Sequence, residues 1–117
     1  MTEKYTFLDF TTAVTELLSE RQGKPTDRVD LRPVLSQVEG YTYEALRLML
    51  KGKRTLKMEA IEGISAVLGV SPHYFLEYRI MWAAQMAKRH PRLGEILYDI
   101  ALHFVQIEEG RVGAGEA

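Results

Sequence analysis

The stretch that decides the fold of this chain, residues 46–76, reads LRLMLKGKRTLKMEAIEGISAVLGVSPHYFL. Its apolar residues recur three or four positions apart, which is the period of one face of an α-helix. Gly52 interrupts the pattern inside a basic loop, and Gly69 interrupts it again. Ser71-Pro72 then supplies a capping hydroxyl and a first-turn proline, a common start of a new helix. We therefore predict three consecutive helices separated by a basic loop and a tight turn.

Similar signals continue on both sides of this stretch. We predict helices over residues 8–21, 30–40, 42–50, 57–68, 72–90 and 92–109, a loop over 22–28 and a frayed tail from 111 to 117. The core would contain, among others, Phe10, Val14, Leu17, Leu18, Leu31, Val34, Leu35, Val38, Tyr74 and Phe75. No segment shows the alternation of a strand. The predicted fold class is all-α, with residues 1–76 as one domain and 77–117 as a C-terminal helical extension.

Composition limits the classes of function. The 117 residues are 46% hydrophobic, enough for one compact domain. Without cysteine the chain has no disulfide, thiolate metal site or cysteine nucleophile, and it suits a reducing compartment. No apolar run is long enough to span a membrane and the start MTEKYTF lacks signal-peptide features, so we expect a cytoplasmic protein without a membrane partner. The formal net charge of −1 means that a nucleic acid would have to be recognised by local charge.

Local charge is concentrated in one segment. Between Ala45 and Met58 the chain carries no acid and five basic residues, namely Arg47, Lys51, Lys53, Arg54 and Lys57. Cations on such a loop neutralise phosphates, which gives affinity and fixes register without reading sequence. The alternative is an ordinary solvated basic face.

The helix before this loop has side chains suited to reading bases. Tyr43, Glu44 and Arg47 lie opposite the apolar Met49 and Leu50, so burying the apolar stripe exposes them. Arginine pairs with guanine, glutamate accepts from cytosine, and tyrosine reaches a thymine methyl or a phosphate. The plainer alternatives are that Glu44 favours its own helix dipole and that Arg47 forms a surface pair with it. Leu48, between the two faces, belongs either to the core or to a contact with thymine methyls.

From about Asp30 to Leu76 the chain resembles the lambda-repressor-like (Cro/Xre) helix-turn-helix family. The resemblance is carried by the twelve-residue spacing from Gly40 to Gly52, the KGKR loop and the AVLGVSPHYF ending. It implies a helix-turn-helix bundle of about five helices that binds double-stranded DNA. By this resemblance the base contacts would be Thr42, Tyr43, Glu44 and Arg47, and the phosphate contacts Arg32, Lys51, Lys53, Arg54 and Lys57. The chain departs from the family in lacking the glutamines that often open both helices, and in its longer first loop.

Catalytic patterns are weak in this sequence. His73, His90 and His103 are widely separated, and none has the spacing of a metal-ligand pair. Ser71 fits a helix cap better than a nucleophile, and there is no glycine-rich phosphate loop. We therefore expect no catalytic residues, no metal, no cofactor and no enzymatic activity.

The last two predicted helices carry more apolar surface than one small domain covers. A homodimer would cover this excess, and it would place two recognition helices on a two-fold DNA site. The predicted dimerisation residues are Trp82, Met86, Ile96, Ile100 and Phe104. The alternative is a monomer whose last two helices fold back on the first, and the adaptable methionines leave room for a further protein partner.

These observations predict a sequence-specific transcriptional regulator, a dimeric repressor that occupies an operator. The alternative function belongs to another class. It is a protein-interaction module, an antirepressor or adaptor, which keeps the helix-turn-helix fold and no longer reads DNA. This alternative is favoured by the small number of polar side chains on residues 43–50 that could contact bases.

Overall fold

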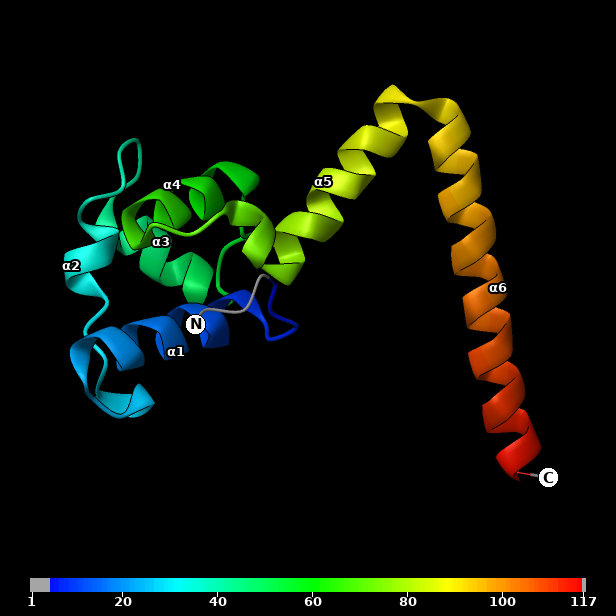
Figure 1. Cartoon of the computed structure of the whole chain (residues 1–117), viewed down its shortest axis with the longest axis horizontal. Coiled ribbons are helices and arrows are strands. Elements are labelled where there is room, and N and C mark those ends of the chain that lie inside the picture. Colours follow the sequence, from blue (N-terminus) through cyan, green and yellow to red (C-terminus); the bar gives the residue numbers. More distant parts are fainter. Residues whose placement is uncertain (1–4, 117) are drawn as a thin grey trace. The chain divides into compact units, whose positions relative to one another are not determined.

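The structure, a computed structural model, describes residues 5–116, with side chains up to Gly110. Over this range the chain is helical and contains no strand (Figure 1), which confirms the predicted all-α class. It forms two compact units, Met1–Met81 and Trp82–Ala117, whereas the predicted domain boundary follows Leu76. Within the described range, no helix has both the length and the apolar character needed to cross a membrane.

The first unit begins with α1 (Phe10–Gln22), close to the predicted range of 8–21. Asp9 starts the helix because its carboxylate accepts a hydrogen bond from the Thr12 N–H at 2.8 Å, and this bond lowers the pKa of Asp9. Gly23 ends it in the left-handed conformation. The predicted loop that follows contains one 3₁₀ turn, η1 (Thr26–Arg28).

The second predicted helix, over residues 30–40, is much shorter than expected. α2 spans only Arg32–Leu35. Beyond it the chain tightens into bonds between residues three apart, including Val38 N–H to the Leu35 carbonyl at 3.3 Å. The tighter path carries Val38 against Gly63 of α4, where a Cβ on the glycine would lie only 2.6 Å from Val38 Cγ1. Tertiary packing of one valine thus overrides the local helix signal.

The next two helices agree with their predicted ranges. α3 (Tyr43–Leu50) is capped by the Thr42 hydroxyl, which accepts from the Ala45 N–H at 3.1 Å. α4 (Met58–Leu68) ends at Gly69, which takes the left-handed conformation. The Thr42 cap and the Gly69 stop are local signals, which is why the sequence locates these helix ends well.

The core of the first unit gathers apolar residues from all four helices and from the segment after α4. Its members are Phe10, Ala13, Val14, Leu17, Leu18, Val34, Leu35, Val38, Leu46, Met49, Leu50, Ala60, Ile61, Ile64, Leu68, Phe75 and Tyr78. Phe10 and Phe75 meet edge to face with ring centroids 4.6 Å apart. Leu31 and Tyr74, both predicted to be core residues, are only partly buried and pack against this cluster.

The prediction of a single helix over residues 72–90 is wrong. The chain instead forms a 3₁₀ turn, η2 (Pro72–Tyr74), passes through extended Phe75 (φ −91°, ψ 135°), and then enters α5 (Leu76–Arg89). The break lets the Phe75 ring reach the core. Arg79 satisfies the carbonyls that the break leaves open, since its Nη1 donates to His73 at 2.9 Å and to Tyr74 at 2.8 Å.

The start of α5 also secures the N-terminal segment. Arg79 Nη2 donates to the Thr6 carbonyl at 2.7 Å, and the Thr6 N–H donates to the Tyr74 carbonyl at 2.9 Å. Glu77 Oε2 accepts from the Phe10 N–H at 2.6 Å and so helps to cap α1. These long-range bonds join the first described residues to η2 and α5.

The second unit contains the end of α5 and α6 (Pro91–Glu116). The predicted stop at Gly110 is wrong, because α6 continues through it to Glu116; the frayed tail over residues 111–117 stays a prediction, and residue 117 lies outside the described range. Gly110 has no positive φ, unlike Gly69, so it acts as an ordinary helical glycine at a cost of about 1 kcal/mol relative to alanine. Figure 1 shows α6 as one uninterrupted ribbon.

Candidate nucleic-acid interface

The two faces of α3 differ in burial as the sequence predicts. Leu46, Met49 and Leu50 are buried in the core, whereas the Glu44 side chain is 59% exposed and the Arg47 side chain 29% exposed. Thr42 is exposed just before the helix, with its oxygen used as the cap. A helix that is anchored by one face and begins in an exposed cap can present its first turns to a partner.

Glu44 and Arg47 form a bidentate pair on the exposed face. Arg47 Nη2 lies 2.5 Å from Glu44 Oε1, and Arg47 Nε donates to Glu44 Oε2 at 3.0 Å. The hydrogen bonds from Arg47 lower the pKa of Glu44, and the charges of Lys51 and Arg54 lower it further. The same hydrogen bonds raise the pKa of Arg47. The two loop cations therefore act electrostatically on the first turn of α3.

Tyr43 lies beside a second arginine. The Arg32 guanidinium carbon is 4.5 Å from the centroid of the Tyr43 ring, a cation–π contact between α2 and α3. Tyr43 is partly buried against the core, and Arg32 is exposed. The structure thus brings together a predicted base contact and a predicted phosphate contact that lie eleven positions apart in the sequence.

The loop after α3 has a defined backbone conformation. Gly52 takes the left-handed conformation (φ 76°) and donates to the Met49 carbonyl at 3.1 Å, while the Lys53 N–H donates to the Leu48 carbonyl at 2.9 Å. These two bonds are those of a Schellman C-cap. The turn leaves Lys51, Lys53 and Arg54 exposed.

Long-range hydrogen bonds hold the ends of two helices in this region. The Thr11 hydroxyl of α1 donates to the Leu50 carbonyl at 2.6 Å, which ties the C-terminal end of α3 to α1. Arg21 donates to the Leu68 carbonyl at the end of α4. Sequence reasoning missed both roles, because threonine and arginine on a helix surface give no signal for a partner about forty residues away.

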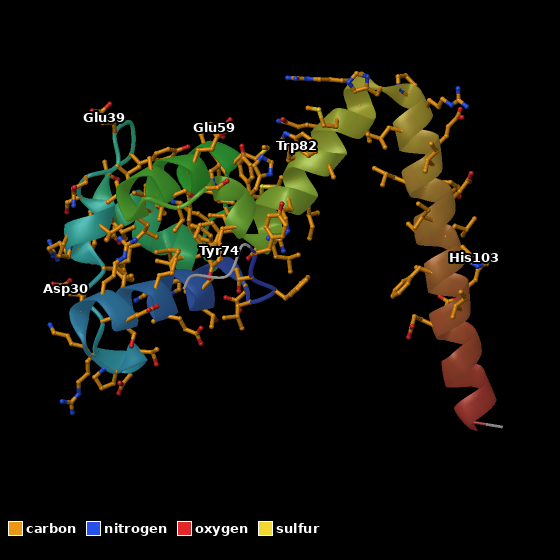
Figure 2. All side chains as sticks on the ribbon, in the orientation of Figure 1. Asp30, Glu39, Glu59, Tyr74, Trp82 and His103 are labelled. Atoms are coloured by element: carbon orange, nitrogen blue, oxygen red, sulfur yellow. The ribbon has the colours of Figure 1, made fainter. Side chains whose placement is uncertain are left out.

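The remaining predicted phosphate contact, Lys57, is exposed at the N-cap of α4. Exposed acids occur on both sides of the stretch from Arg47 to Lys57, and Figure 2 shows Glu39 on the loop before α3 and Glu59 on α4. Between Gly40 and Met58, Glu44 is the sole acid in the sequence. Leu48 is half-buried, intermediate between the core and the exposed face.

The histidines and acids do not form a metal-binding cluster in the described part of the chain, where no group of three or more potential ligands comes together. His73 instead packs edge-on against Tyr78, with ring centroids 5.0 Å apart.

The residues predicted for dimerisation lie on α5 and α6. Trp82, Ile96, Ile100 and Phe104 are exposed, and Met86 is half-buried. Figure 2 marks Trp82 on α5 and His103 on α6.

Comparison of the chain with protein-family models, with curated proteins and with solved structures gave no match.

Proposed function

We propose that the first unit is a helix-turn-helix of the lambda-repressor-like class and binds duplex DNA through α3. The observation that carries the proposal is the position of four exposed cations, Lys51, Lys53, Arg54 and Lys57, directly after a helix whose opposite face is in the core. An α-helix fits the major groove, where its N-terminal residues reach base edges. The resemblance implies that a helix over about residues 34–40 supports α3. α2 is shorter, with one turn, and Val38 beyond its end is nevertheless buried in the core.

The Schellman turn at Gly52 favours a role in holding the DNA backbone. Two backbone hydrogen bonds fix the turn, so the backbone that carries Lys51, Lys53 and Arg54 is ordered before any DNA is bound. Phosphate contacts from such a loop would position α3 and supply most of the sequence-independent affinity.

Reading of bases falls to Glu44 and Arg47 in this proposal. Arginine donates to guanine O6 and N7, and glutamate accepts from cytosine N4, so the pair matches neighbouring G and C edges in the major groove. Tyr43, under Arg32, would contact a thymine methyl or a phosphate at the edge of the same site.

The test is a selection from random duplexes followed by mobility-shift titrations at several salt concentrations. We expect one enriched sequence. The logarithm of the binding constant should fall linearly with the logarithm of the salt concentration, with a slope of about 0.9 for each phosphate contacted. If no duplex is enriched or bound at low salt, the DNA-binding proposal is wrong.

The second candidate is a protein-interaction module built on the same fold. The observation that favours it is that both arginines beside the exposed face, Arg32 and Arg47, already have intramolecular partners. The same selection separates the candidates, since an antirepressor or adaptor would enrich no duplex.

We further propose that the protein acts in the cytoplasm as a homodimeric repressor. A two-fold pair presents two α3 helices to an operator of two inverted half-sites, roughly 34 Å apart, which is one turn of DNA. Inserting about half a turn between the half-sites should sharply weaken binding. If the protein binds isolated and paired half-sites with equal affinity, it does not bind DNA as a dimer.

A further inference from the structure

The second unit has no buried side chain among those described. From Trp82 to Gly110 every side chain is exposed or half-buried. α6 nevertheless carries a regular apolar pattern, with residues spaced alternately four and three positions apart. We call these residues the apolar seam; they are Leu93, Leu97, Ile100, Phe104 and Ile107. Heptad spacing places all five on one helical face, which is the pattern of a helix that packs against another helix.

The apolar seam is most exposed over its second half. Ile100 and Phe104 are each 61% exposed and Ile107 is 43% exposed. A shallow, mainly apolar groove follows the same part of α6, and its lining includes these three residues. Side chains of a facing helix insert between residues arranged in this way.

The charges around α6 are segregated along its length. Basic residues precede or open the helix, namely Lys88, Arg89 and Arg92. Two acids, Glu108 and Glu109, follow the seam together with one further arginine, Arg111, so the net charge is positive at the first end and negative at the second. The helix dipole adds positive charge at the N-terminal end. Two other acids do not distinguish parallel from antiparallel packing of two such helices. Asp99 lies near the middle of the seam, and Glu95 lies on the opposite side of α6, about half a helical turn from the seam at roughly 100° per residue.

We propose that the apolar seam of α6 packs against the seam of a second copy of this chain, with the two helices antiparallel. Antiparallel packing places the basic end of each helix beside the acidic end of the other, while parallel packing places like charges together. This inference rests on the homodimer proposed above and adds the contact surface and its direction. The two-fold axis passes near Ile100, the middle of the seam.

The short length of the seam limits the strength of the contact between the two copies. Five residues make about two heptads, fewer than the three or four that sustain a typical coiled coil. The dimer therefore dissociates on dilution, and added salt weakens it because part of the attraction is between charged ends.

Cross-linking tests the direction of packing without DNA. The chain has no cysteine, so Leu93→Cys and Ile107→Cys each introduce a single thiol. In the antiparallel pair, like positions at either end of the seam are about 21 Å apart along the axis, at about 1.5 Å per residue, while position 93 of one copy lies near position 107 of the other. A short bis-maleimide should therefore link a mixture of the two variants and should not link either variant alone, at concentrations where light scattering shows a dimer.

Each other result overturns the proposal. Linkage within each single variant and none between them shows parallel helices. A dimer without any linkage shows that another surface is used, and a monomer at all concentrations removes the seam contact. Because no DNA is present, these failures leave the DNA-binding proposal untouched, and failure of DNA binding leaves the seam intact.

A pair of charge substitutions tests the same surface. Phe104→Glu lies in the seam and should shift the protein to monomer, whereas Leu102→Glu, about half a turn away on α6, should leave the dimer in place. Circular dichroism checks that both variants remain helical. If the two variants dissociate alike or neither does, the seam is not the contact.

Discussion

Glu44 and Arg47 hold each other through two hydrogen bonds on the exposed face of α3. The guanidinium edge that would meet a guanine is therefore already occupied by a carboxylate in the free protein. In the proposed complex with DNA, Arg47 must either exchange Glu44 for a base or contact the bases together with Glu44. Each residue can be tested separately.

Arg47→Ala should remove base preference at one or two positions and cost about 1 to 3 kcal/mol on the best site. The free energy of unfolding should hardly change, because an exposed pair of this kind contributes roughly 0.2 to 0.5 kcal/mol. Titrations on the selected site and on random DNA measure the difference. An equal loss on both would reassign Arg47 to the DNA backbone.

Glu44→Gln keeps the shape of the side chain and removes the charge that holds Arg47. We expect tighter binding to random duplexes and weaker preference for cytosine at one position, since the arginine is then available to phosphates. Glu39→Gln, an exposed acid before α3, is the matched control for removal of one negative charge. The specificity role is refuted if both variants tighten random binding equally and keep the same preference.

Replacing Lys53 and Arg54 together by alanine should weaken binding to all sequences alike. In a plot of the logarithm of the binding constant against the logarithm of the salt concentration, the magnitude of the slope should fall by about one to two. Each phosphate neutralised by a cation contributes roughly 0.9 to that slope. The control is Lys24→Ala with Arg28→Ala, which removes the same charge from exposed positions in the loop after α1. If the two double variants weaken binding by the same factor, general charge and not the Gly52 turn explains binding.

Gly63→Ala should destabilise the first unit by about 1 to 3 kcal/mol, since the new methyl group would overlap Val38 in a packed core. Adding Val38→Ala should reduce the overlap and restore part of the stability. Gly110→Ala is the control, because nothing lies within 4 Å of that position and the change should favour α6. Thermal unfolding followed by circular dichroism measures all three. Equal stability of Gly63→Ala and wild type would show that Val38 moves without cost.

Tyr78 should make stability depend on pH above neutrality. Its hydroxyl donates to Glu62 at 2.7 Å, and this bond raises the pKa of Tyr78 from 10.0 to about 12. A raised folded-state pKa means that the contribution is complete below about pH 10 and disappears as the pH rises from there through about 12. Tyr78→Phe should cost about 1 kcal/mol at about pH 8 and should lose less stability than wild type over this interval.

Denaturant unfolding of wild type, Tyr78→Phe and the exposed control Tyr98→Phe, each at about pH 8 and about pH 11.5, isolates the effect. The control should follow wild type, because the other basic and phenolic groups titrate equally in both. A constant difference between Tyr78→Phe and wild type at the two pH values would contradict the role of the hydrogen bond.

The helices that the sequence locates well are those with local signals at both ends. Thr42 and Gly52 bracket α3, and Asp9 and Gly23 bracket α1. The errors arise where a distant residue decides the backbone. Beyond the short α2, Val38 packs against Gly63 of α4, and at the break before α5 the Phe75 ring enters the core while Arg79 donates to the His73 and Tyr74 carbonyls.

The candidate interface follows the same division. Exposure of Lys51, Lys53 and Arg54 was predictable, because they follow directly on a helix with one apolar face. The contact between Arg32 and Tyr43 was not, since it crosses from α2 to α3 and the connection between these helices, residues 36–42, differs from the predicted one. Periodicity describes one helix at a time, and such contacts depend on how helices are joined.

The bonds made at the start of α5 determine how far the first unit can be trimmed. A protein cut after Leu76 would lose Glu77, Tyr78 and Arg79, and with them the cap on Phe10, the bond to Glu62 and one of the two hydrogen bonds that hold Thr6. A cut after Met81 keeps all three. The smallest autonomous fragment for DNA-binding or crystallisation work is therefore one that retains the first turns of α5, even though no residue there is proposed to touch DNA.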